Sequence, residues 1–222
     1  MLRNLIGGAS FEDTLIAILI NIPIALLALS VHEAAHGYIS SKLGDPTAKN
    51  LGRLTINPIK HLDPIGFICM VLFGIGWANP VPINTRYFKK PRRDMALSAA
   101  AGPISNLLLA VIFALILKGF LFLPNALYTS LGVFTQIIIM FLTQAISLNV
   151  FFAVFNLIPV PPFDGSRILY VFLPPKYYFG VMKYERYICL GFMLLLFLGV
   201  FDPILNFLST MVQMIIYNTI IF

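Results

Sequence analysis

Two histidines and a glutamate lie close together in the run H-E-A-A-H at residues 32–36. On a helix, side chains four positions apart share one face, because one turn takes 3.6 residues. Both imidazoles could therefore bind one metal ion. Glu33 stands next to His32 and could reach a metal-bound water as an acid/base. The pattern predicts a metal site with its own proton carrier.

The surroundings of this motif are apolar, and the composition indicates an integral membrane protein. The chain has 222 residues, of which 59% are hydrophobic and 11% charged, whereas soluble domains carry about 25% charged residues. The net charge of +6 is therefore not read as a sign of nucleic-acid binding. Polar and ionisable groups are costly at membrane depth, so three of them together predict a functional site.

The apolar pattern predicts an all-α polytopic membrane protein forming a single domain over residues 1–222. Its core is expected at 14–173, with additional C-terminal helices at 180–222. A transmembrane helix needs about 20 apolar residues. About five such helices are predicted, at residues 14–42, 94–123, 126–158, 187–201 and 204–222.

Two further segments are expected between the first two predicted spans. Residues 65–77 are apolar but too few for a span, which favours a re-entrant segment. Leu51, Leu54 and Ile56, together with Thr55, predict a short membrane-associated β hairpin or sheet.

The basic residues predict the orientation in the membrane. Nine lysines and arginines lie between residues 42 and 93. With 65–77 re-entrant, all nine fall on one side, which the positive-inside rule makes cytoplasmic. Asp164 then emerges at the cytoplasmic end of the third span. His36 lies six residues, about 9 Å, before Lys42, so the metal motif falls in the cytoplasmic half of the bilayer.

A third ligand is needed, because catalytic zinc usually has three protein ligands and one open position. The candidates are the ionisable residues His61, Asp63, Asp94, Asp164, Glu185 and Asp202. Asp164 is favoured, because the prolines 161 and 162, Phe163 and Gly165 form a rigid apolar frame around it. The alternative role for Asp164 is that of a cap opening a short helix that follows.

The chain resembles the site-2 protease family of intramembrane zinc metalloproteases, peptidase family M50, in its compact prokaryotic form. The likeness rests on H-E-A-A-H at 32–36 and N-L-I-P-V-P-P-F-D-G at 156–165. The runs G-P-I-S-N at 102–106 and G-W-A-N-P-V-P-I-N at 76–84 are also similar. The resemblance covers about residues 27–173.

The resemblance implies a Zn²⁺-dependent endopeptidase that cleaves a transmembrane segment of another membrane protein near the cytoplasmic side. It implies a multi-pass protein of a prokaryotic inner membrane. The implied zinc ligands are His32, His36 and Asp164. Glu33 would be the catalytic acid/base, and Asn156 would lie near the scissile peptide. Asn106 is a weaker candidate for positioning the substrate.

Other interpretations of the same residues stay open at this point. The histidines and asparagines could join helices by hydrogen bonds. The cluster could bind a passing metal ion in a transporter or channel, although the outer halves of the spans offer few polar residues beyond Thr135, Gln136 and Gln144. The chain could also be a catalytically inactive binding module, although no element of the site is missing. The oligomeric state is not predicted.

Overall fold

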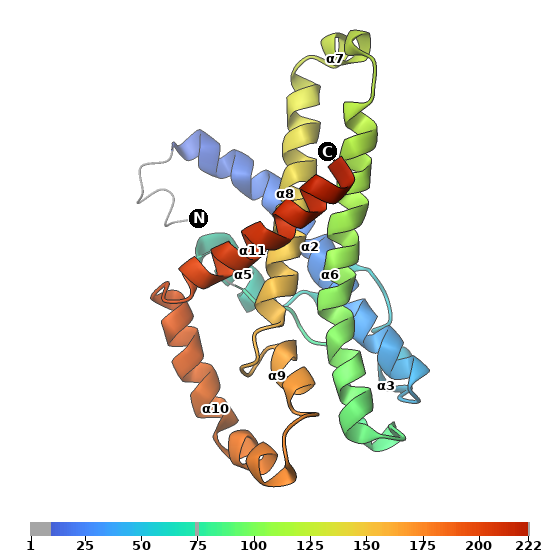
Figure 1. The fold of residues 1–222 in the computed structure, drawn as a ribbon, viewed down its shortest axis with the longest axis vertical. Coiled ribbons are helices and arrows are strands. Elements are labelled where there is room, and N and C mark those ends of the chain that lie inside the picture. The colour runs from blue at the N-terminus through green and yellow to red at the C-terminus, as the bar shows by residue number, and fades with distance from the viewer. Residues whose placement is uncertain (1–9, 74–75, 222) are drawn as a thin grey trace.

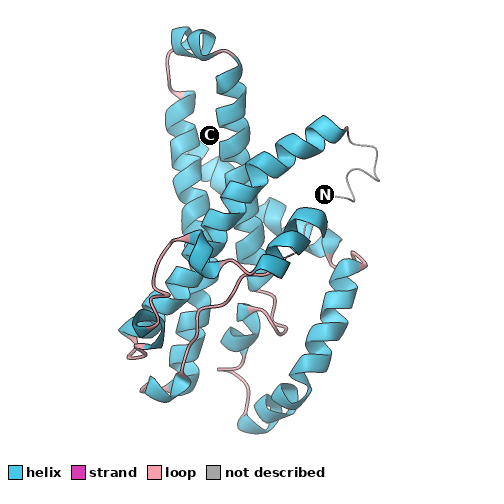
Figure 2. Cartoon of the chain, turned by 180° about the vertical axis from the view of Figure 1, so that it is seen from behind, coloured by secondary structure: helices cyan, strands magenta, loops and turns pink. Residues whose placement is uncertain are grey.

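The computed structural model describes residues 10–73 and 76–221. Its longer helices are α2 (Phe11–Lys42), α6 (Pro91–Leu121), α8 (Val133–Asn156), α10 (Pro175–Phe197) and α11 (Asp202–Ile216). Its shorter helical elements are α3 (Thr47–Asn50), α4 (Pro58–His61), α5 (Pro64–Phe73), η1 (Thr85–Tyr87), α7 (Asn125–Leu131), α9 (Asp164–Leu169) and the π-helical turn η2 (Tyr217–Ile221). Figure 2 shows these helices joined by loops.

Four helices in the described part of the chain are long and apolar enough to cross a membrane. They are Glu12–Lys42 of α2, then α6, α8, and Asp202–Ile221 of α11 with η2. The predicted count of five is not confirmed, because the segment 187–201 falls within α10 and the turn after it. α10 carries Lys183, Glu185 and Arg186 in its middle, which leaves only a short apolar part beyond them.

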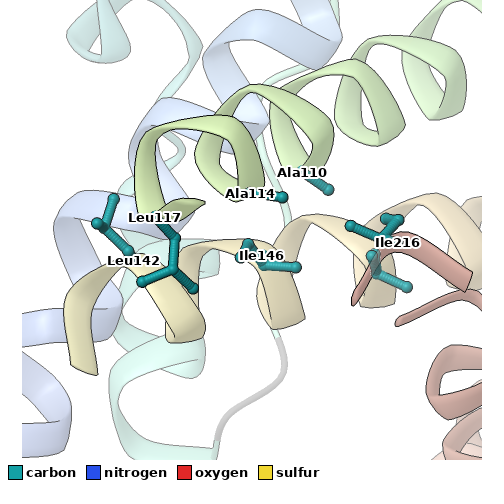
Figure 3. Packing of buried hydrophobic residues seen from close by; sticks show 7 residues of the cluster. Ala110, Ala114, Leu117, Leu142, Ile146 and Ile216 are labelled. Carbon is teal, nitrogen blue, oxygen red and sulfur yellow. The ribbon is translucent and has the colours of Figure 1, made fainter. Parts of the chain in front are cut away.

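Three helices form the centre of the molecule (Figure 1). α6 and α8 run antiparallel and are joined by α7 at one end, and α2 crosses both. α6 presents the small side chains Ala110 and Ala114 to Ile146 of α8, and Ile216 of α11 completes this cluster (Figure 3). Small residues let apolar helices approach closely, which is the usual basis of packing in a membrane.

The segment predicted to be re-entrant turns back on itself. Leu62 forms an antiparallel bridge with Ala78, and the amide of Asn79 donates to the carbonyl of His61 at 2.7 Å. Gly66 in α5 lies against the backbone of Trp77 so closely that a β-carbon would collide with it. The two ends of this segment therefore lie side by side, as the predicted re-entrant course requires.

The predicted β hairpin is not confirmed, since no sheet occurs among the described residues and Leu62–Ala78 is an isolated bridge. Residues 51–56 instead form a turn and a loop after α3. Gly52 has a φ of +63°, which glycine adopts without strain, and the amide of Arg53 closes the turn on the carbonyl of Ala48. Leu51 and Ile56 remain exposed.

Candidate metal centre

His32, His36 and Asp164 meet in the interior, although 132 positions separate the first from the last. The Nε2 atoms of His32 and His36 lie 3.0 and 3.2 Å from the same atom, Oδ2 of Asp164. All three side chains are buried, and one ligand atom from each lies within 4.8 Å of the others. α2 and α9 thus bring together the three residues predicted as ligands.

Asp164 is held in place by the chain around it. Gly165 lies against the carbonyls of Leu157 and Ile158, where a β-carbon would collide. The ring of Phe163 is buried and packs edge-on against Phe155 at 4.5 Å. α9 begins at Asp164 itself, so the N-cap position is occupied by Phe163 and not by Asp164. The carboxylate is directed at the histidines, which favours the ligand role over the cap.

The electrostatic environment of Asp164 favours its charged form. Burial opposes ionisation, but contacts with the imidazoles of His32 and His36 outweigh this and hold the pKa of Asp164 well below its usual value. The group therefore faces the histidines as an anion.

The second nitrogen of each histidine has a hydrogen-bond partner of its own. Nδ1 of His36 lies 2.8 Å from the carbonyl oxygen of Ser98, and Nδ1 of His32 lies 2.6 Å from Oδ1 of Asn106. Both partners are acceptors, so both Nδ1 atoms carry hydrogen and both Nε2 atoms present lone pairs in the neutral rings. This arrangement is typical of histidines that bind metals.

The donor set fits a zinc ion. When both rings are neutral, two imidazole lone pairs and a carboxylate oxygen converge, and this arrangement is stable only with positive charge among them, supplied either by protons on the rings or by a metal ion. Two nitrogens and one carboxylate are a ligand set found in catalytic zinc sites, which keep a fourth position open.

Glu33 lies beside this cluster and is half-buried. Its Oε2 accepts a hydrogen bond from the backbone amide of Val81 at 2.8 Å. The segment 79–84 that carries Val81 is fixed at both ends. Arg53 donates to the carbonyl of Asn79 at 2.7 Å, and the amide of Asn84 donates to the buried carboxylate of Asp45 at 2.7 Å.

α6 passes directly over the two imidazoles at Gly102. A β-carbon at this position would lie 2.5 Å from Nε2 of His32 and 2.6 Å from Cε1 of His36. Non-bonded carbon contacts this short are essentially absent from real structures, so a larger side chain here would force the two imidazoles to move. The sequence run that contains Gly102 thus borders the cluster.

The two asparagines named from the sequence lie in different places. Asn106 is fully buried between helices and contacts His32. Asn156 is the last residue of α8, and its side-chain amide donates to the carbonyl of Phe152 at 3.0 Å in the same helix. The structure therefore does not bring Asn156 into hydrogen-bond contact with the cluster.

Three contributors to the site escaped the sequence analysis: the carbonyl of Ser98, the amide of Val81 and the side chain of Asn149. Main-chain groups carry no signal in the residue types. Asn149 did offer one, because a buried amide in the apolar run of α8 is costly unless it has partners.

Comparison with known proteins decides the family. The family model of Peptidase family M50 matches residues 22–198. The chain belongs to this family. It is 43% identical over 177 residues to "Putative zinc metalloprotease YwhC" of Bacillus subtilis, which covers 79% of this chain and 77% of that protein. It is 29% identical over 157 residues to "Putative zinc metalloprotease Rip2" of Mycolicibacterium smegmatis. That match covers 68% of this chain and 56% of that protein. No solved structure matches the chain.

Family membership identifies the activity that the predicted metal site serves. The chain is a multi-pass membrane protein and a zinc metalloprotease, and its buried cluster of two histidines and an aspartate fits Zn²⁺. Membership in a peptidase family also favours proteolysis over the metal transporter or channel and over the inactive module that the sequence left open.

Proposed function

We propose that this M50 protein is an intramembrane endopeptidase, which cleaves a peptide bond in or near a transmembrane segment of another membrane protein. The observation that carries the proposal is the position of the cluster. His32 and His36 lie within α2, one of the four apolar helices, so the zinc they would hold lies among membrane spans. A protease placed there meets substrates that are themselves in the membrane.

The roles follow from the contacts. His32, His36 and Asp164 would hold the zinc, which when bound supplies a Lewis acid that polarises a carbonyl and acidifies water. Glu33 takes the proton from the attacking water and delivers a proton to the leaving amide nitrogen. The amide of Val81 holds the Glu33 carboxylate in place beside the cluster.

Asn156 is proposed to bind the substrate backbone or the developing oxyanion. In the structure its side chain is satisfied by Phe152 of its own helix, so this role requires the side chain to turn toward a bound substrate. Catalytic hydrogen bonds commonly form only once the substrate is in place.

We propose that an unwound apolar segment of a substrate docks in an open groove on α2. The groove has a volume of about 530 Å³ and is lined by Val31, Ala34, Ala35 and Tyr38 together with residues 54–56. Glu33 and the two histidines are not among its lining residues, so a substrate docked there must extend around α2 to reach them. A helical substrate must unwind before cleavage, because its hydrogen bonds shield the peptide groups.

The site is proposed to lie in the cytoplasmic half of a prokaryotic inner membrane. The return of residues 62–78 to their starting point supports this, because it leaves the basic residues between α2 and α6 on one side. The end of α8 that leads to Asp164 then lies on that side as well.

A cleavage assay in proteoliposomes tests the proposal. The zinc-loaded protein is incubated with a panel of single-span proteins and, separately, with their soluble domains alone. We expect cleavage only of the membrane-anchored forms, with cut sites mapped by mass spectrometry to the apolar segment or its edge. Cleavage restricted to the soluble domains would overturn the intramembrane assignment.

A further inference from the structure

We infer that Asn149, acting through Asn106, is a positioning residue that fixes the proton on His32 and thereby tunes zinc binding. This inference rests on the proposed role of His32 as a zinc ligand. Asn106 and Asn149 are 0% and 1% exposed, and they come from α6 and α8. With His32 they form one chain of hydrogen bonds across three spans.

The direction of this chain is set by two backbone carbonyls, which can only accept hydrogen bonds. The side-chain NH₂ of Asn149 donates to the carbonyl of Ala145 at 2.9 Å, so its oxygen is the group that faces Asn106. The amide oxygen and nitrogen look alike in shape, and such a partner is what distinguishes them.

The same reasoning applies one step closer to the metal. The NH₂ of Asn106 donates to the oxygen of Asn149 at 3.1 Å and to the carbonyl of Ala28 at 3.3 Å. Both of its hydrogens are therefore used, and its oxygen faces Nδ1 of His32 at 2.6 Å. Nδ1 must then be the donor, which leaves Nε2 free to bind the metal.

Without this chain, either nitrogen of His32 could carry the proton. A ring with its proton on Nε2 cannot bind the cluster's ion until the proton moves. Asn106 prevents this directly, and Asn149 prevents it indirectly, because it keeps Asn106 from turning its NH₂ toward the histidine. Partners of this kind alter metal affinity by about 10–100-fold when removed.

Zinc affinity of the full chain in detergent, measured by competition with a chromophoric chelator, tests the inference through a double-mutant cycle. We expect Asn106→Ala to weaken zinc binding by about 10–100-fold and Asn149→Ala by about 10-fold. Because Asn149 acts through Asn106, the double variant should bind zinc no more weakly than Asn106→Ala alone. A purely structural role for Asn149 predicts instead that the two losses add.

Three further variants make the test sharper. Asn149→Asp, as a neutral acid, can still donate to Ala145 and accept from Asn106, so it should keep the wild-type affinity. Thr143→Val removes a hydroxyl whose hydrogen bonds stay within α8, to Ile139 and Met140, and should also bind zinc normally. If Asn149→Ala does not fold, Asn149→Ser, whose hydroxyl is too short to reach Asn106, takes its place.

The absorption of the Co²⁺-substituted protein gives an independent readout of the ligand geometry. We expect altered visible bands in Asn149→Ala and unchanged bands in Thr143→Val. The inference would be overturned if Asn149→Ala bound zinc as tightly as the wild type. It would also be overturned if Asn149→Ala weakened zinc binding by the same factor in the wild type and in the Asn106→Ala variant. If His32→Ala bound zinc as tightly as the wild type, the zinc assignment itself would fail, whatever the asparagine variants did.

Discussion

At the scale of single residues, the geometry around the cluster separates ligands from supporting groups. The Nε2 atoms of both histidines and the carboxylate of Asp164 converge, while the Nδ1 atoms point outward to Ser98 and Asn106. A residue that only joined helices would not need two directed nitrogens. A single metal site would account for two histidines in the apolar helix α2 and a carboxylate of α9 buried against them.

Asp164→Asn tests the ligand role of the carboxylate. An amide keeps the size of the side chain but loses its charge, so we expect zinc affinity to fall by more than the ~10–100-fold typical of outer partners. Metal content after dialysis is the measurement. Asp63→Asn is the matched control, because an amide oxygen can still accept from the amide of Gly66. Equal zinc content in both variants would remove Asp164 from the site.

Gly102 marks the closest approach between a helix and the ligands. Gly102→Ala places a methyl group about where the rings of His32 and His36 lie, so the rings must move. Overpacking of this kind costs about 1–3 kcal/mol. We expect a lower unfolding temperature and a zinc affinity reduced by about 10-fold or more, comparable to the loss of an outer partner.

Gly119→Ala is the control for this prediction. Gly119 lies in the same helix, and nothing lies within 4 Å of a β-carbon built there. It should bind zinc as the wild type does and unfold at the same or a slightly higher temperature, since alanine favours helix. If the two variants behave alike, the close approach at Gly102 has no functional consequence.

At the scale of elements, the sequence predicted the helices that carry the site and missed their fine divisions. α2 ends at Lys42, where the pattern placed the end of the first predicted span. The third predicted span was drawn as one segment, whereas Gly132, with a φ of +52°, divides it into α7 and α8. Apolar periodicity continues through this glycine, so the pattern alone could not show the break.

The contacts between elements were the least predictable part. Asp164 was favoured because of the rigid apolar frame around it, and few ionisable residues competed with it in this chain. The hydrogen bond from Val81 to Glu33 depends on where a loop backbone passes, and the residue type says nothing about that. The predicted hairpin failed for the same reason, since strand pairing depends on partners that single-sequence patterns do not supply.

Val81→Pro tests the loop contact at the element scale. Proline has no amide hydrogen, so the carboxylate of Glu33 loses its donor while its own side chain is untouched. We expect kcat to fall with zinc content unchanged. Pro82→Ala, one position further along the same loop, is the control and should retain activity. Full activity in Val81→Pro would show that this contact does not hold Glu33 for catalysis.

At the scale of the whole molecule, the proposed orientation rests on the four apolar helices and on the adjacent ends of segment 62–78. α6 starts at Pro91, within the basic run at residues 86–93, and ends at Leu121. Because α6 is long and apolar enough to span, we expect residues before and after it to lie on opposite sides. The orientation, and with it the depth of the site, depends on which of these sides is cytoplasmic.

Labelling of single cysteines with a membrane-impermeant maleimide measures the orientation. After Cys69 and Cys189 are replaced by serine, a cysteine is introduced at Lys89 or at Phe122, which is 77% exposed. We expect Phe122→Cys to react in intact cells and Lys89→Cys to react only after lysis. The reverse pattern would place the cluster in the outer half of the bilayer.

The central claim is that the cluster and Glu33 form one proteolytic site in the membrane, and cleavage by Glu33→Gln tests it most directly. The variant keeps His32, His36 and Asp164, so it should bind zinc as the wild type does. It lacks the group that moves protons, so cleavage of a single-span substrate in proteoliposomes should fall by about 10²–10⁴-fold. Cleavage by zinc-loaded Glu33→Gln at the wild-type rate would contradict the account.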